Sequence, residues 1–457
     1  EGFEAEAGEY AGLAAHFAVL RSIVARYKND FEAAIALAER ALRLAPQDLS
    51  SQDNAQLQAI IFLALASAYD GAGDLEKAVA AYAQTIHWSH QGAIASGFGI
   101  TIRQAGALRL LGRLRAADKA CREALKYIQD QGMGRLPVTG ILYIAMSEVC
   151  LERNDLEATE AYLTRGIELG KGSGRFDAVS NAAPTLARLR QARQDASGAL
   201  AAIQEAESAL SEPPSPLARA ELLALKAKVL VRQGTVSEAA RWSEEAVRLA
   251  GQDQGQTGGM VALAASRVML AQGRAGEAVA ELTQSLATAQ ARGCLGAATE
   301  IYILRSLALV SQGAVQKAEA DLEHALALAE PEGYMRIFLD EGQPMRRLLA
   351  QWLARAGSGP LRDYAVRLLS AFDAEAQPVP GRHEKASPQG DLVEALSQRE
   401  LEVLHLIASG RTNQEIAGQL FVAPGTVKAH TASIYRKLDV ANRTEAVARA
   451  RQLGILP

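Results

Sequence analysis

Cysteine is scarce in this chain. Only Cys121, Cys150 and Cys294 occur among 457 residues, and no two of them form a C-x-x-C pair. This spacing fits neither a disulfide framework nor a zinc site, and it favours a reducing compartment, so we expect a cytoplasmic protein. No apolar run approaches the roughly 20 residues of a membrane helix, so we expect no membrane partner. The chain begins with Glu1 rather than Met and shows no signal peptide, which favours a segment of a longer protein.

Aromatic residues (5%) and prolines (14) are also few, whereas 49% of the residues are hydrophobic, with abundant Ala and Leu. Ala and Leu have high helix propensity, whereas β-branched and aromatic residues favour strands, so the composition predicts an all-α protein. The length predicts two or more domains. The formal net charge is −4, yet residues 392–457 contain eight Lys or Arg against six Asp or Glu, so the tail carries the net positive charge.

A pattern of about forty residues recurs eight times. Each unit has a small or polar turn followed a few residues later by an anchor residue, and the anchors stand 39 to 44 residues apart: Ala34, Ala78, Ala117, Thr159, Ala199, Ala239, Ala278 and Ala318. Eight residues beyond the anchor, seven units carry an apolar residue, which we expect to be buried on the anchor's face. In the exception that place holds Glu207, and Ala206 is expected to be buried instead. Residues 1–330 therefore predict a TPR-like α-solenoid of about eight helix-turn-helix repeats.

Three further segments follow the repeats. Residues 331–372 are predicted to form terminal helices that close the solenoid. Residues 373–391 contain three prolines and two glycines, which predicts a flexible linker. Residues 392–457 are then expected to fold as a separate small domain.

Capping boxes organise this last domain. Ser397–Glu400, Thr412–Glu415 and the box-like Asn442–Glu445 each predict the start of a helix. The stretch APGTVKAHTASIYRKL, residues 423–438, forms the remaining helix, with Val427, Ile434 and Leu438 on one arc and no acidic residue on the opposite arc. A short helix, a brief turn and a longer helix with a polar face are typical of a helix-turn-helix DNA-binding domain.

The segments LSQRELEVLHLIASGRTNQEIAGQL and TVKAHTASIYRKLDVANRTEAV resemble the LuxR-type four-helix DNA-binding domain over almost its full length. With the solenoid and the segment EGYMRIFLDEG, the whole chain resembles the C-terminal part of large MalT-like transcriptional activators. The resemblance implies a regulator whose solenoid senses an inducer or a regulatory protein and whose tail binds double-stranded promoter DNA as a homodimer or higher oligomer. RNA polymerase is a further expected partner. These relatives carry an ATP-binding domain ahead of the repeats, so we expect no cofactor in this chain and ATP only through such a domain.

The resemblance also implies which residues contact DNA. Base edges would be read by Lys428, Ala429 and Ala432, with Lys428 donating to guanine and the alanines contacting thymine methyl groups. Phosphate contacts are expected from Thr426, Arg436 and Lys437. Backbone contacts at the starts of neighbouring helices are expected from Thr412, Asn413 and Arg443. His430 lies at the edge of the buried arc, where we expect it to pack rather than to read a base.

Two other functions were considered. The chain could be a repeat scaffold for protein–protein interaction, with a C-terminal bundle that binds a protein partner. It could also be a hydrolase using His87 or Cys121, but there is no G-x-S-x-G or H-E-x-x-H motif, and the Lys of GKGSG at 170–174 is not followed by Ser or Thr. The sequence therefore predicts no enzyme, no catalytic residue and no metal ligand.

Overall fold

The computed structural model describes residues 11–45, 52–91, 97–137, 139–170, 178–210, 215–251, 256–376, 398–409 and 411–419, then 427, 431, 433–435, 437–438, 440 and 442–452. They belong to two units, 1–375 and 376–457. Every regular element among the described residues is a helix. The prediction of an all-α protein is confirmed.

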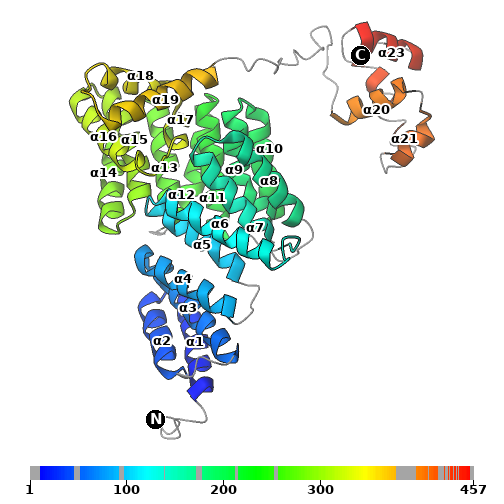
Figure 1. The fold of residues 1–457 in the computed structure, drawn as a ribbon. Helices are drawn as coiled ribbons and strands as arrows, with labels where there is room; N and C mark the ends of the chain where they lie inside the picture. Colours follow the sequence, from blue (N-terminus) through cyan, green and yellow to red (C-terminus); the bar gives the residue numbers. More distant parts are fainter. Residues whose placement is uncertain are drawn as a thin grey trace. The chain divides into compact units, whose positions relative to one another are not determined.

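The first unit is built from eight helix pairs, which lie side by side in chain order in Figure 1. The pairs are α1 (Ala11–Tyr27) with α2 (Phe31–Leu44), α3 (Gln52–Ala72) with α4 (Leu75–Gln91), α5 (Gly97–Leu110) with α6 (Leu114–Asp130), α7 (Thr139–Glu152) with α8 (Leu156–Gly170), α9 (Ala178–Ala192) with α10 (Ala196–Ala209), α11 (Pro216–Arg232) with α12 (Val236–Ala250), α13 (Gln256–Ala271) with α14 (Ala275–Ala291), and α15 (Leu295–Ser311) with α16 (Val315–Ala329). The predicted solenoid is confirmed.

One backbone conformation repeats in the turn inside every pair. The residue five places before each anchor has a positive φ between 59° and 81°: Asn29, Gly73, Gly112, Asn154, Gln194, Gly234, Gly273 and Gly313. The next amide donates to the carbonyl five residues back, as the amide of Asp74 does to Tyr69 at 2.9 Å. This is the Schellman ending of a helix, which a left-handed residue makes possible. The small or polar residues of the sequence pattern therefore set these turns.

The anchors are the best-buried positions of the repeats, with all eight at 0% exposure. The predicted second position was wrong for two units, because Leu42 and Val247 are 36% and 47% exposed. Offset eight is buried in only some units, as at Leu286 and Leu326, whereas burial is more regular four and seven places beyond the anchor, as at Ile203 and Ala206, both 0% exposed. At 100° per residue, offset four lies within 40° of the anchor and offset seven within 20°, whereas offset eight lies 80° away. The buried stripe is therefore narrow and made largely of small residues.

Gly313 offers a test of the left-handed turns. Its φ is 77°, and a Cβ added there would meet no atom within 4 Å, so Gly313→Ala changes only backbone conformation. We expect the free energy of unfolding, measured by urea titration of the whole chain, to fall by about 1 kcal/mol. Gly106 within α5 has equal space and is not among the positive-φ residues, so Gly106→Ala should raise it by about 0.5–1 kcal/mol. Changes of the same sign in both variants would contradict the assignment.

The terminal helices are α17 (Arg336–Leu339), α18 (Gly342–Leu353) and α19 (Pro360–Ala376). Their apolar residues, among them Phe338, Trp352 and Tyr364, join one core cluster with residues of α5–α7 and α13–α16. The solenoid also contacts itself across this core. Gly296, in the first turn of α15, lies so close to the end of α5 that a Cβ there would come within 2.0 Å of the Arg109 carbonyl oxygen.

The predicted linker, residues 373–391, begins too early, because α19 extends to Ala376. Residues 373–376 continue α19, because two of them have partners in the solenoid: Asp373 accepts from Arg346 at 2.7 Å, and Glu375 pairs with the buried Arg336. The rest of the predicted linker, residues 377–391, lies outside the described residues. Among the helices that the structure does describe, none is long and apolar enough to cross a membrane.

Candidate functional site

The second unit contains α20 (Gln398–Ala408), α21 (Asn413–Gln419) and α23 (Arg443–Gln452), with described positions of the predicted recognition helix between α21 and α23. Its core consists of the apolar positions expected from the sequence. Val403, Leu404, Val427 and Ile434 are 0% exposed, and Ile407, Ile416, Ala417, Leu438, Ala446 and Ala450 complete the cluster. The predicted buried arc of the recognition helix is confirmed at Val427, Ile434 and Leu438.

The helix starts use the predicted capping chemistry. The backbone amide of Thr412 donates to Glu415 Oε2 at 2.7 Å, and the amide of Glu415 donates to Thr412 Oγ1 at 3.3 Å. The backbone bond from Thr412, followed by its hydroxyl, lowers the pKa of Glu415. At the next box the amide of Glu445 donates to Asn442 Oδ1 at 3.0 Å. These reciprocal bonds hold the starts of α21 and α23.

Two residues predicted to contact DNA have partners inside the unit. Lys437 Nζ lies 2.9 Å from Glu400 Oε2, and the two side chains are only 10% and 6% exposed. Arg443 Nη2 donates to the carbonyl oxygen of Ile407 at 2.6 Å, which satisfies an acceptor at the end of α20. Both contacts connect residues 36 or 37 positions apart, so no local sequence pattern indicates them. The DNA contacts of Lys437 and Arg443 stay predictions.

The structure describes the side chains of some of the other predicted DNA contacts but not of the rest. Thr412 is exposed and Asn413 partly exposed at the start of α21, where both are accessible to a phosphate. Tyr435 of the recognition helix is half-buried and packs against the core cluster rather than standing free on the outer face. Five predicted residues have side chains outside the described residues: Thr426, Lys428, Ala429, Ala432 and Arg436. His430 also lies outside them.

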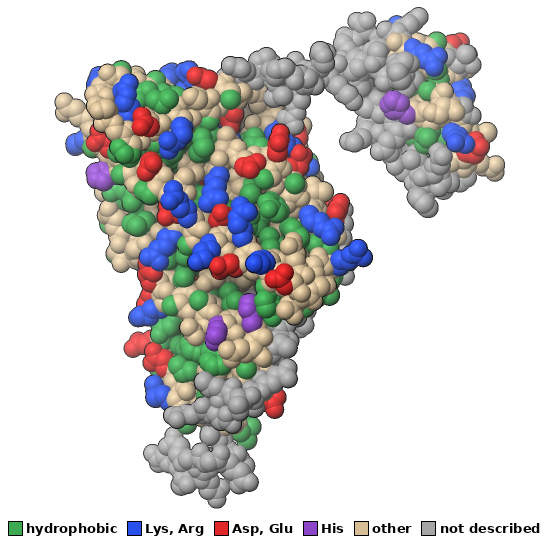
Figure 2. All heavy atoms as spheres, viewed as in Figure 1, with side chains coloured by type: hydrophobic (Ala, Val, Ile, Leu, Met, Phe, Trp, Pro, Cys, Tyr) green, Lys and Arg blue, Asp and Glu red, His purple; other side chains and the backbone are tan. Residues whose placement is uncertain are grey.

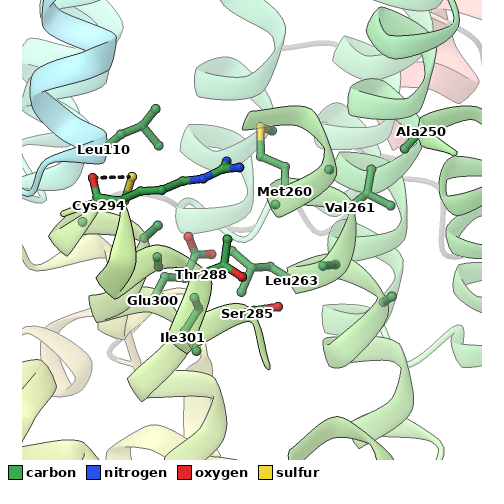
Figure 3. A pocket seen from close by; sticks show the side chains of 18 of the residues that line it. Leu110, Ala250, Met260, Val261, Leu263, Ser285, Thr288, Cys294, Glu300 and Ile301 are labelled. Atoms are coloured by element: carbon green, nitrogen blue, oxygen red, sulfur yellow. Dashed lines mark hydrogen bonds between the residues drawn. The ribbon is translucent and has the colours of Figure 1, made fainter. Parts of the chain in front are cut away.

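The solenoid offers a different kind of site. A cavity of about 670 Å³ lies inside the first unit, lined by residues from α3 to α15 and by Tyr334 and Ile337 of the terminal segment. In Figure 3, Met260, Val261 and Leu263 of α13 face Ser285 and Thr288 of α14, with Glu300 and Ile301 of α15 on the same wall. This size is typical of small-molecule sites.

A buried ion network borders the cavity and centres on Asp340, which is 2% exposed. Arg188 and Arg336 each donate to it at 2.8 Å, while Lys228 and Arg232 lie 3.7 and 3.5 Å away. Burial alone would raise the pKa of Asp340, but these cations, Arg188 first, hold that pKa well below its usual range. The network joins α9 and α11 to the terminal segment, so it fixes residues 334–341 within the solenoid.

A second carboxylate of the network is also ionised. Burial opposes the charge of Glu300, but Arg267, which donates to it at 2.6 Å, and Lys228 lower the pKa of Glu300 to about 2. Arg267 donates to Glu341 at 2.6 Å as well. Neighbouring cations thus hold Asp340 and Glu300 ionised, whereas burial and Arg267 lower the pKa of Lys228.

The two candidates for hydrolytic chemistry differ in burial, because Cys121 is buried whereas His87 is exposed. Cys121 is 0% exposed in the core cluster, and burial raises the pKa of its thiol to about 12, opposite to a reactive thiolate. His87 Nε2 lies 3.1 Å from Gln91 Nε2, and the His87 ring meets the Trp88 ring edge-on with 5.2 Å between centroids. On the face seen in Figure 2, Lys and Arg side chains are interspersed with Asp and Glu over the solenoid, so this face shows no broad basic patch.

The first unit is a helical-repeat region of the TPR type, and the second has the core and capped helix starts of a helix-turn-helix domain. Residues 15–355 match the family model described as MalT-like TPR region, and residues 394–450 match that of the bacterial regulatory proteins of the luxR family. Since the first match covers well over half of the chain, the chain belongs to the MalT-like regulators of the LuxR family.

Individual relatives agree with this placement. The HTH-type transcriptional regulator MalT of Serratia proteamaculans is 27% identical over 96% of this chain and 49% of its own length. MalT of Vibrio cholerae is 33% identical over 33% of this chain and 18% of that protein. The chain thus spans about half the length of the relative that it matches from end to end. Among solved structures, a signal-transduction ATPase with a tetratricopeptide repeat sensor from Pyrococcus horikoshii covers 81% of this chain and 53% of its own, at 13% identity and a TM-score of 0.44.

Proposed function

We propose that this chain activates transcription by binding promoter DNA through its tail, under the control of a signal received by the solenoid. The observation that carries the proposal is the helix-turn-helix arrangement of the second unit, with its buried core and capped helix starts. The relatives are named as transcriptional regulators, which supports the same function. The signal is an inducer or a regulatory protein, and the protein acts in the cytoplasm without a cofactor of its own.

The proposed DNA interface follows the recognition helix. Lys428, Ala429 and Ala432 read base edges in the major groove, and Thr426 and Arg436 contact phosphates. Thr412 and Asn413 add contacts from the start of α21, where the positive end of the helix dipole favours an anion. The α23 helix pairs with a second copy, so the site has two half-sites about one helical turn apart, and RNA polymerase is the downstream partner.

Salt titration of DNA binding tests the proposal. The tail should bind duplex promoter DNA with a log affinity that falls linearly with log salt, because phosphate contacts release counterions. In the same titration, Lys428→Ala should reduce the binding free energy by about 1–3 kcal/mol through one base position of the site. It should change the affinity for unrelated duplexes little. Fluorescence anisotropy with a panel of single-base variants of the site measures both effects.

The control for this experiment is a charged residue that is not among the predicted DNA contacts. Glu445→Gln changes a charge on α23 and should leave the base preference unchanged. An equal loss on every sequence for Lys428→Ala would mean that Lys428 contacts only phosphate. No salt-sensitive binding to any duplex would overturn the proposal and favour the scaffold function.

A further inference from the structure

One face of α1 carries a row of exposed apolar side chains, which we call the α1 seam. Its five members have exposed fractions between 51% and 75%: Leu13, Phe17, Leu20, Val24 and Tyr27. In the part of the chain that the structure describes, no other helix has more than two exposed large apolar residues. Single apolar residues are normal at a protein surface, whereas a contiguous row of them marks an interaction site.

The spacing of the α1 seam is that of a surface that pairs with another helix. Its members follow one another by four, three, four and three residues, which is the a and d pattern of a coiled coil. At 100° per residue they fall within an arc of about 80°. The residues that join α1 to the core, Ala15, Ala18 and Val19, lie on the opposite side of the helix. The helix α1 therefore has two apolar faces, of which one is already packed.

The charged residues beside the α1 seam are basic. No Asp or Glu occurs between residues 11 and 29. Arg21 and Lys28 are exposed and occupy the e positions that follow Leu20 and Tyr27, so both lie along one edge of the seam. Charges at such positions select the partner of a helix pair, because they form ion pairs across the seam. A second copy of α1 has no acidic residue for this edge, so the charges favour a different helix that carries Asp or Glu there.

We propose that the α1 seam docks an acidic amphipathic helix of a regulatory protein. The apolar face of that helix packs against Phe17, Leu20 and Val24, and its Asp or Glu side chains pair with Arg21 and Lys28. The inference rests on the proposed function only in taking a regulatory protein as the signal.

The packed face of α1 connects the α1 seam to the repeats that line the cavity. In Figure 1, α1 lies beside α2 and α3, and Val19 of α1 belongs to the same core cluster as Ile61 of α3 and Tyr82 of α4. The turn between α3 and α4 contributes Gly73 to the lining of the cavity. A protein held on α1 therefore acts on a repeat that forms part of the cavity wall.

Fluorescence anisotropy of two designed peptides, titrated with the whole chain, tests the chemistry of the partner. Each peptide has about three heptads with Leu at a and d. The e and g positions are all Glu in one peptide and all Lys in the other, so like charges keep each peptide from pairing with itself. We expect the Glu peptide to bind about tenfold or more tightly than the Lys peptide, with a smaller difference at high salt. Equal binding of both peptides, or binding of neither, would overturn the proposal.

Variants of exposed residues locate the site. Phe17→Ser and Leu20→Ser should each weaken binding of the Glu peptide about tenfold or more, because each removes a large apolar side chain from the seam. Val366→Ser is the matched control, since Val366 is 44% exposed but lies on α19. The double change Arg21→Glu and Lys28→Glu should reverse the preference, so that the Lys peptide binds more tightly. An unchanged preference in this variant would contradict the proposed ion pairs.

Two further measurements separate this inference from its alternatives. Light scattering gives the mass of the chain in solution, and a dimer that Leu20→Ser converts to a monomer would show that a second copy occupies the seam instead. Circular dichroism identifies a variant that fails to fold, in which case the charge-reversed variant and the two peptides on the unchanged chain decide. DNA binding is measured separately: its loss in the unchanged chain contradicts the proposed function, whereas intact DNA binding without peptide binding contradicts only this inference.

Discussion

Replacing Asp340 with Asn is expected to lower the free energy of unfolding of the solenoid by about 3–5 kcal/mol. The substitution keeps the shape of the side chain but removes the one carboxylate on which four cations converge, at 2% exposure. These four cations, of which Arg336 is fully buried, then lose their shared partner and repel one another. Urea unfolding of the whole chain, followed by circular dichroism, measures the change.

The control is a carboxylate at the surface. Asp373 pairs with Arg346 at 2.7 Å, but its side chain is 53% exposed. Asp373→Asn should therefore lower the free energy of unfolding by less than about 1 kcal/mol. The two variants should also differ in acid. The folded-state pKa of Asp340 is depressed, so its stabilisation is present above the unfolded value near ~3.9 and is lost as pH falls below it. Asp340→Asn should remove that part of the acid sensitivity, and equal losses in both variants would contradict the network's role.

Replacing Lys437 with Met is expected to destabilise the DNA-binding unit by about 3 kcal/mol. The change leaves Glu400, at 6% side-chain exposure, without the ammonium that lies 2.9 Å away. Such a loss is large for a domain of this size, so the thermal transition of the tail should shift down strongly. DNA affinity should then fall equally for all sequences.

A double variant separates the two possible roles of Lys437. Adding Glu400→Gln to Lys437→Met removes the buried negative charge that Lys437 no longer balances, so part of the lost stability should return. If Lys437 instead contacts phosphate, Lys437→Met leaves the thermal transition in place and reduces the salt slope by about one. The second result would favour the contact that the sequence predicted.

The features that the sequence predicted best are local ones. The eight turns and their anchors recur every 39 to 44 residues, and each turn needs only a residue that accepts a positive φ. The boxes at Thr412 and Asn442 likewise span four residues each. The second buried position was wrong at Leu42 and Val247, because their apolar character indicates burial whereas offset eight lies 80° from the anchor, at the edge of the packing face.

The sites depend on pairs that are far apart in the chain. Arg188 and Asp340 are separated by 152 residues, and Lys437 and Glu400 by 37, so no spacing rule connects them. The buried Arg336 looks in the sequence like any surface arginine near a helix start. Only the path of the terminal segment through the solenoid, which follows from the folded arrangement, brings these charges to the cavity.

The contacts that join α5 and α6 to residues 332–334 have a consequence for folding. A linear repeat array can lose units from one end, because each unit touches only its neighbours. Here the Tyr334 hydroxyl donates to the Arg109 carbonyl at 3.3 Å across 225 residues, and the Arg115 amide donates to Glu332 at 2.7 Å across 217. These contacts close a long loop late in folding, so the repeats from α5 to α19 should form and melt together, and more slowly than a short-range helical array.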